Sequence, residues 1–166
     1  GGHNYLKPEL IKDIVEYLNG TIIENCTAYG GKRQKLEDHL KCVEDHGFTK
    51  IAKVDILDAE GEFSIPTKIG SKHLKEDIVG SHLENYDSLL MLSHFKGHAM
   101  AGYGGAIKNV GIGISSPSGK VYVHTAGTQT SGSIFYNDQD AWLEALAEMV
   151  LGFSNHVGAE HIIYIN

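Results

Sequence analysis

Apolar residues recur at helical spacing in three segments of the chain, and this pattern predicts three amphipathic helices. The first predicted helix covers residues 8–18, begins with a proline that suits a first turn, and ends before Gly20. The second covers residues 36–43 and ends before Gly47. The third is the longest and runs from residue 138 to residue 153, with its large apolar side chains on one face.

Short apolar runs lie between and after these helices, and they predict strands. Runs at residues 21–24 and 51–57 have strand character, and residues 62–66 are expected to form an edge strand. The continuous run at 89–92 is typical of a strand buried on both faces, and residues 120–124 predict another short strand. Strands that alternate with helices in this way favour an α/β fold with a mostly parallel sheet and helices on both faces, a Rossmann-like three-layer sandwich.

The size of the chain predicts a single α/β domain over residues 1–166. A chain of 166 residues with 42% hydrophobic residues can bury one compact core, and no shift in composition divides it. The abrupt opening at Gly1 and the final apolar run at residues 161–166 are also compatible with a fragment of a longer protein, because a strand normally needs a neighbour.

Charge and cysteine content exclude several classes of protein. The formal net charge is −7, so we expect neither nucleic acid nor an anionic membrane surface as a partner. No apolar run approaches the roughly 18–20 residues of a membrane span, and the amino terminus lacks the pattern of a signal peptide, so we expect a cytoplasmic protein. The two cysteines, Cys26 and Cys42, are too few for a disulfide-rich scaffold and are expected to be reduced, buried thiols.

The segment from Ser93 to Gly113 is the strongest candidate site in the sequence. It follows the predicted strand at 89–92 directly, and in an open parallel sheet ligands bind beyond the carboxyl ends of the strands. Five glycines between Gly97 and Gly111 allow the backbone to approach a ligand closely. Two histidines and two lysines in the same segment supply proton-transfer groups and positive charge: His94, Lys96, His98 and Lys108.

These residues predict a site for a small anionic ligand or cofactor. Lys96, Lys108 and the Gly104–Gly105 backbone would hold the anionic group, with a helix start after the double glycine presenting its free amide groups. His94, His98 and Lys108 are the candidate catalytic residues, because histidine transfers protons near neutral pH. The expected cofactor-binding residues are Lys96, Gly102, Gly104, Gly105, Asn109 and Arg33.

Other interpretations of the same residues stay open. His94 and His98 could bind a metal ion, with His124, His3 or an acidic residue as the third ligand. They could instead be ordinary loop residues that bond to backbone carbonyls, and the glycines could serve helix–strand packing alone. Arg33 is the only arginine of the chain and could hold a carboxylate or phosphate, or remain solvated on the surface.

The candidate segment also resembles a known family. The runs LSHFKGH at residues 92–98 and AGYGGAIKNVG at residues 101–111 are similar to the uncharacterised bacterial and archaeal family catalogued as domain of unknown function 362, often labelled iron–sulfur centre proteins. The segments at residues 4–10 and 29–33 and the end of the chain share the resemblance. It implies an iron–sulfur cluster, which many members bind through a cysteine-rich ferredoxin-like insertion. This chain has no such insertion, and two cysteines cannot supply the four thiolates that a cluster requires.

A shorter stretch resembles the lactate racemase family, which uses a nickel-pincer nucleotide. His98, residues 101–105 and Lys108 stand in the order and separation of that family's motif, which implies a histidine that accepts a proton and a lysine that meets the cofactor. From the residues and both resemblances, we expect a redox-associated or enzymatic domain that binds an anionic ligand. The alternatives are a non-catalytic domain that docks an electron-transfer partner and a metal-binding module.

Overall fold

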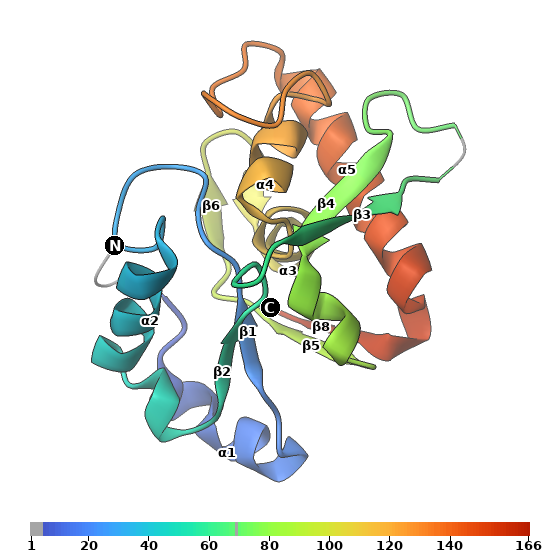
Figure 1. Ribbon diagram of the computed structural model, residues 1–166. Coiled ribbons are helices and arrows are strands. Elements are labelled where there is room, and N and C mark those ends of the chain that lie inside the picture. The colour runs from blue at the N-terminus through green and yellow to red at the C-terminus, as the bar shows by residue number, and fades with distance from the viewer. Residues whose placement is uncertain (1–4, 69) are drawn as a thin grey trace.

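The computed structural model describes residues 5–68 and 70–166 and has a mixed α/β fold (Figure 1). The helices of this part of the chain are α1 (Pro8–Leu18), α2 (Leu36–Asp45), α3 (Ala106–Lys108), α4 (Pro117–His124) and α5 (Gln139–Val157). The strands are β1 (Ile22–Glu24), β2 (Val54–Ile56), β3 (Glu62–Pro66), β4 (Glu76–Gly80), β5 (Leu89–Leu92), β6 (Lys96–His98), β7 (Gly102–Gly104) and β8 (Ile162–Ile165). A π-helix, η3 (Asn109–Gly113), follows α3 directly.

The strands of the described residues form four separate two-stranded sheets instead of one large sheet. Two pairs are parallel, β1 with β2 and β5 with β8, and two are antiparallel, β3 with β4 and β6 with β7. Each strand has only three to five residues, so it offers few backbone groups to a second neighbour. The predicted α/β class is confirmed, whereas a mostly parallel sheet and a Rossmann-like three-layer sandwich are not confirmed.

Most of the helices and strands predicted from hydrophobic periodicity are present. Helix α1 begins at Pro8 and ends at Asn19, whose φ of 48° is left-handed and stops the helix. Helix α5 begins after Asp138, whose carboxylate accepts a hydrogen bond from the Ala141 amide at 3.0 Å and caps the first turn. Strand β5 pairs in parallel with β8, so the final apolar run has a neighbour within the chain.

The prediction of a strand at residues 120–124 is wrong, because these residues belong to helix α4. Pro117 occupies the first turn, and the Ser116 hydroxyl accepts a hydrogen bond from the Gly119 amide at 3.2 Å, which caps the helix. Residues 119–123 are all buried, since α4 packs against β4, α5 and η3. A helix that is buried all round shows no 3.6-residue period, and its valines then resemble those of a strand.

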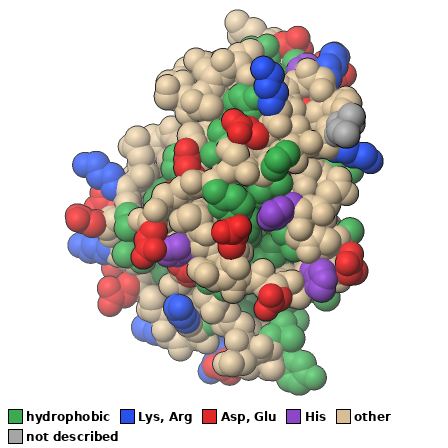
Figure 2. All heavy atoms as spheres, turned by 45° about the vertical axis from the view of Figure 1, so that its right-hand side comes forward, with side chains coloured by type: hydrophobic (Ala, Val, Ile, Leu, Met, Phe, Trp, Pro, Cys, Tyr) green, Lys and Arg blue, Asp and Glu red, His purple; other side chains and the backbone are tan. Residues whose placement is uncertain are grey.

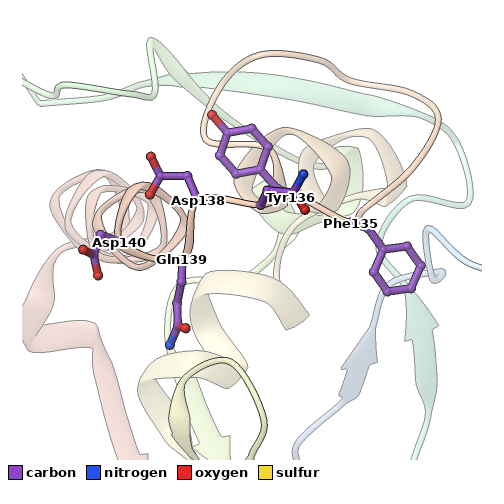
Figure 3. A pocket seen from close by; sticks show the side chains of 6 residues that line it. Phe135, Tyr136, Asp138, Gln139 and Asp140 are labelled. Carbon is purple, nitrogen blue, oxygen red and sulfur yellow. The ribbon is translucent and has the colours of Figure 1, made fainter.

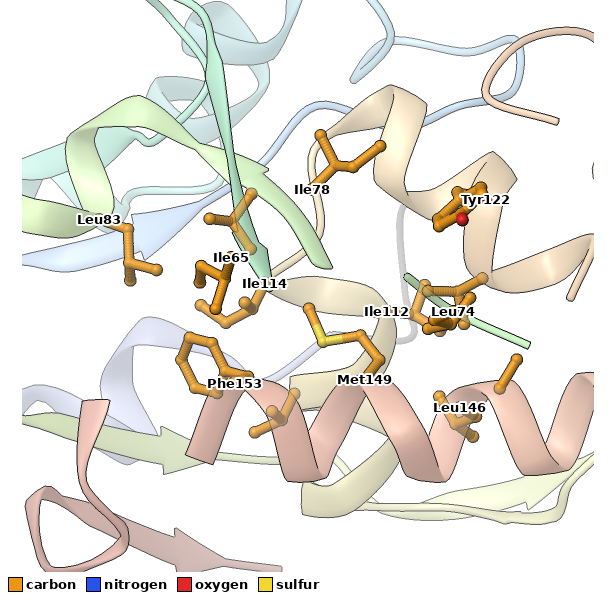
Figure 4. Close-up of a cluster of buried hydrophobic side chains, with 14 of the residues drawn as sticks. Ile65, Leu74, Ile78, Leu83, Ile112, Ile114, Tyr122, Leu146, Met149 and Phe153 are labelled. Carbon is orange, nitrogen blue, oxygen red and sulfur yellow. The ribbon is translucent and has the colours of Figure 1, made fainter. Parts of the chain in front are cut away.

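The main hydrophobic core lies against the inner face of α5 (Figure 4). Trp142, Met149 and Phe153 of α5 are completely buried there, beside side chains from β4, η3 and α4. A second, smaller cluster of Cys26, Val43 and Ile56 packs α2 against β1 and β2. Both cysteines are free and buried, as predicted.

None of the helices among the described residues has the length and apolarity of a transmembrane helix. Acidic and basic side chains are mixed over the face shown in Figure 2, and no broad basic area is visible on it.

Candidate functional site

The candidate segment of residues 93–113 forms a small hairpin followed by a short helix. Strand β5 ends at Leu92, and β6 and β7 then pair so that Lys96 lies opposite Gly104 and His98 opposite Gly102. Gly102 has a φ of 68°, a left-handed conformation that a side chain would disfavour. The segment therefore has more regular structure than a glycine-rich loop, and the hairpin brings its two ends together.

His98 is held firmly by hydrogen bonds and by an aromatic contact. Its Nδ1 accepts hydrogen bonds from the backbone amides of Met100, at 3.2 Å, and Ala101, at 3.1 Å. The imidazole stacks on the indole of Trp142, with ring centroids 5.9 Å apart and planes 17° apart. Burial lowers the pKa of His98, and the charges of Lys108 and Lys96 lower it further.

His124 reaches the same indole from the last turn of α4. Its ring centroid lies 5.7 Å from that of Trp142, and its Nδ1 is 2.7 Å from the carbonyl oxygen of Lys120. Burial lowers the pKa of His124 despite this hydrogen bond, and the charges of Lys108 and His98 add to the effect. Trp142 therefore contacts two histidines that come from elements distant in the sequence.

Lys108 and Lys96 place positive charge beside His98. A Cβ atom built on Gly104 would lie 3.6 Å from His98 Cβ and 3.6 Å from Lys108 Cδ, so these two side chains both lie against Gly104. Burial lowers the pKa of Lys108, and the neighbouring charge of Lys96 lowers it further. Within residues 5–68 and 70–166, neither lysine forms an ion pair. We call Lys96, His98, Lys108 and His124 the histidine–lysine cluster.

A surface depression lies at the start of α5. It has a volume of about 760 Å³ and is lined by residues 135–140 (Figure 3). The Gln139 side chain at its edge donates a hydrogen bond to the Met100 carbonyl at 2.7 Å, and the amide of Met100 bonds to His98. The depression is thus joined to the hairpin by the first turn of α5.

Two of the predicted cofactor-binding residues, Gly105 and Asn109, lie in close contact with other parts of the chain. The Ala106 amide, at the start of α3, donates to the Asn166 side-chain oxygen at 2.7 Å, so an asparagine meets this helix end. A Cβ atom on Gly105 would collide with that oxygen and with the ring of Tyr103. Asn109 donates to the Ser93 hydroxyl at 3.3 Å and ties η3 to the end of β5.

Three other predicted site residues lie apart from the cluster or outside the described residues. His94 is exposed and makes no hydrogen bond or ion pair with a described residue. Arg33 lies beyond β1, where its Nη1 is 4.0 Å from Glu24 Oε2. His3 falls outside the described residues. In the described part of the chain, no group of three or more His, Cys, Asp or Glu side chains is placed to hold a metal ion.

A family model described as Domain of unknown function (DUF362) matches residues 1–165. The chain belongs to the DUF362 family. The resemblance seen in the sequence is therefore confirmed, whereas the similarity to lactate racemases and the iron–sulfur association stay predictions. None of the curated proteins and none of the solved structures matches this DUF362 chain.

The sequence predicted only Arg33 of a second polar cluster in this DUF362 chain. It lies at the carboxyl ends of the parallel strands β1 and β2, where the Cys26 amide donates to Asp58 Oδ1 at 2.8 Å. Lys120 enters from α4, is 5% exposed, and donates a hydrogen bond to the Ser115 carbonyl. Burial lowers the pKa of Lys120 to about 8, although the charges of Glu24 and Asp58 oppose the shift.

The remaining groups of this second cluster are neutral or paired. His39 is 1% exposed, and burial lowers its pKa to about 4, with the charge of Arg33 adding to the effect. Burial and Asp58 raise the pKa of Cys26 to about 12, so the thiol is neutral and unreactive. We call Glu24, Cys26, Arg33, His39, Asp58 and Lys120 the β1–β2 cluster. The polar run after the first predicted strand was the signal that could have revealed it.

Proposed function

We propose that this DUF362 chain binds a small anionic ligand at the histidine–lysine cluster and acts on it as an enzyme or a redox-associated protein. The observation that carries the proposal is the position of Lys96 and Lys108 beside His98 with no acidic partner among the described residues. A carboxylate or phosphate would relieve the repulsion between these cations.

A buried donor in the same place supports an anionic ligand. The indole Nε1 of Trp142 is buried and has no hydrogen-bond partner within the described residues, although its ring contacts both histidines. Buried N–H groups are rarely left unpaired, so a ligand atom or water that accepts a hydrogen bond is expected nearby. On the hairpin, a Cβ atom at Gly97 or Gly102 would meet nothing within 4 Å, so the surface there is open to a ligand.

Titration calorimetry with inorganic phosphate and with acetate tests the proposal. We expect saturable binding to the wild type that weakens with salt, and a dissociation constant at least about tenfold larger for Lys108→Met. The matched control is Lys41→Met, which removes an exposed lysine from α2 and should bind like the wild type. Equal affinity in Lys108→Met and the wild type would refute an anion site at this cluster.

A non-catalytic docking role is the second candidate. Phe95 and Tyr103 on the β6–β7 hairpin are 60% and 52% exposed, with ring centroids 6.4 Å apart. Exposed neighbouring aromatic rings beside a cationic site are suited to covering by a partner such as an electron carrier. The test is a double variant, Phe95→Ser with Tyr103→Ser. This role is favoured if the variant still binds anions but no longer binds a redox partner that the wild type binds.

The finer expectations about architecture, cofactors and location remain proposals. A Rossmann-like three-layer sandwich, a cytoplasmic location and a role beside iron–sulfur or nickel-nucleotide chemistry are compatible with the residues. Two buried cysteines, one of them a neutral thiol beside Asp58, do not fit an iron–sulfur cluster held by this chain. Nucleic acid and membrane surfaces are not proposed as partners.

A further inference from the structure

The hydrogen bonds of His98 define which ring nitrogen carries its proton. Its Nδ1 receives two backbone N–H groups, from Met100 and Ala101, and can accept them only with a free lone pair. The neutral ring must then carry its proton on Nε2. Because burial, Lys108 and Lys96 all lower the pKa of His98, the ring is neutral near pH 7 and presents Nε2–H as a donor.

The hydrogen bond of His124 defines the opposite arrangement. Its Nδ1 lies 2.7 Å from the Lys120 carbonyl oxygen, which can only accept, so Nδ1 carries the proton. The neutral ring of His124 therefore has a lone pair on Nε2. The lowered pKa of His124 keeps this lone pair available near neutral pH.

We propose that His98 and His124 act as a complementary donor and acceptor pair on a small anionic carbonyl compound, such as a 2-oxo acid or a phosphorylated ketone. The inference rests on the proposed function, since Lys108 and Lys96 bind the anionic group. The carbonyl oxygen of such a compound accepts the Nε2–H of His98. The carbon next to the carbonyl carries an acidic proton that the Nε2 of His124 removes.

The resulting step is a balanced proton transfer. The C–H bond next to the carbonyl breaks, its proton forms an N–H bond on His124 Nε2, and its electron pair moves to the carbonyl oxygen as an enolate. His98 keeps its own proton and stabilises the enolate oxygen through a hydrogen bond. The positive charges of Lys108 and Lys96 stabilise the negative charge that develops on the enolate oxygen. No oxidant, reductant or metal ion is needed for this step.

The same arrangement disfavours His98 as a metal ligand. A histidine that binds a metal through Nε2 normally carries its proton on Nδ1 and donates it to an acceptor. The Nδ1 of His98 instead accepts from two backbone donors. If Nε2 bound a metal ion, the proton of the neutral ring would have to move to Nδ1, and the amides of Met100 and Ala101 would lose their acceptor. His124 has the opposite arrangement, but a single such residue makes no metal site.

Nitrogen-15 NMR of the free protein tests the two tautomers directly. At pH 7, ring correlation spectra should place the proton on Nε2 in His98 and on Nδ1 in His124, assigned with His98→Asn and His124→Asn. Identical tautomers in His98 and His124 would overturn the proposal, whatever the result of the anion-binding experiment.

Hydrogen–deuterium exchange then tests the reaction. In D₂O, proton NMR should show loss of the methyl protons of pyruvate or the C–H protons of dihydroxyacetone phosphate in the presence of the protein. The two probes distinguish a carboxylate from a phosphate as the bound group. Catalysed exchange of neither probe, in protein that binds phosphate, would overturn the proton-transfer roles while leaving the anion site intact.

Matched substitutions separate catalytic from structural effects. His124→Asn keeps a donor to the Lys120 carbonyl but lacks the Nε2 lone pair, so exchange should fall at least about 100-fold. For His98, Gln retains a donor near the Nε2 position and Asn does not, so His98→Asn should lose more exchange than His98→Gln. The control is His161→Asn on the exposed surface. Wild-type exchange in His124→Asn, or a greater loss in His98→Gln than in His98→Asn, would refute these roles.

Discussion

The histidine–lysine cluster and the β1–β2 cluster differ in how their charges are balanced. In the β1–β2 cluster, Lys120 is accompanied by the carboxylates of Glu24 and Asp58, both of which favour its charged form. In the histidine–lysine cluster, Lys108 is affected by Lys96 but by no acidic side chain. Both clusters lie just beyond the carboxyl ends of parallel strands, so strand position alone does not distinguish a ligand site from a structural one.

Charge balance does distinguish them. A buried cation with nearby carboxylates and a backbone acceptor needs no further partner, and removing it would leave those groups unpaired. A half-buried Lys108 with the exposed Lys96 beside it is stabilised only when an anion arrives from outside. We expect this difference to appear in measurements of stability, with the largest effects at the β1–β2 cluster.

The buried His39 of the β1–β2 cluster should lower the free energy of unfolding at acidic pH. Because burial lowers its pKa from the ordinary 6.5 to about 4, the unfolded state takes up a proton between these pH values and the folded state does not. This group should therefore cost the wild type about 3 kcal/mol of unfolding free energy between pH 7 and pH 4. Urea unfolding at both pH values should show a smaller loss in His39→Gln. Equal losses would mean that the cluster accommodates a charged His39.

Lys120→Met should destabilise the protein through the same cluster. The substitution leaves the Ser115 carbonyl without its side-chain donor and the carboxylates of Glu24 and Asp58 without a buried cation. We expect a loss of about 1–3 kcal/mol in urea unfolding at pH 7, with phosphate binding still measurable in the folded protein. A stability equal to that of the exposed control Lys41→Met would show that Lys120 has no structural role.

Short apolar runs predicted β1, β2, β3 and β5 but not β4, β6 or β7. Hydrophobic periodicity was sufficient to predict α1, α2 and α5, because each of these helices has an exposed and a buried face. It failed for α4, whose residues 119–123 are buried on every side and therefore have no polar face to define a period. It also could not specify which strands pair. The parallel pairing of β5 with β8 joins residues more than seventy positions apart, and only long-range packing determines it.

The candidate site was predictable only where its residues are close in sequence. His98, Lys96 and Lys108 fall within one short segment, and the β6–β7 hairpin brings them together. The sequence named His124 only as a possible third metal ligand. It lies near His98 because α4 and α5 pack so that Trp142 contacts both histidines. The other members of the β1–β2 cluster, apart from Arg33, were missed for the same reason, since Lys120 reaches β1 from a helix nearly one hundred positions later in the sequence.

Lys108→Met should change stability very little, in contrast to Lys120→Met. Removing Lys108 relieves its repulsion with Lys96 and its own desolvation, and no carboxylate loses a partner. We expect a change within about 0.5 kcal/mol in urea unfolding at pH 7, towards higher stability, together with the loss of anion binding proposed above. A destabilisation as large as that of Lys120→Met would mean that both clusters are structural and would remove the distinction between them.

His94→Ala should have the smallest effect on both stability and function. His94 was expected to share proton transfer with His98, yet its side chain is exposed and bonds to no described residue. Without a partner its tautomer is not fixed, so it cannot act as a defined donor or acceptor in the way that His98 and His124 do. Stability within about 0.5 kcal/mol of the wild type and unchanged deuterium exchange are expected. A loss of exchange comparable to that of His124→Asn would place His94 in the reacting site and His124 in a supporting role, since a proton needs only one acceptor.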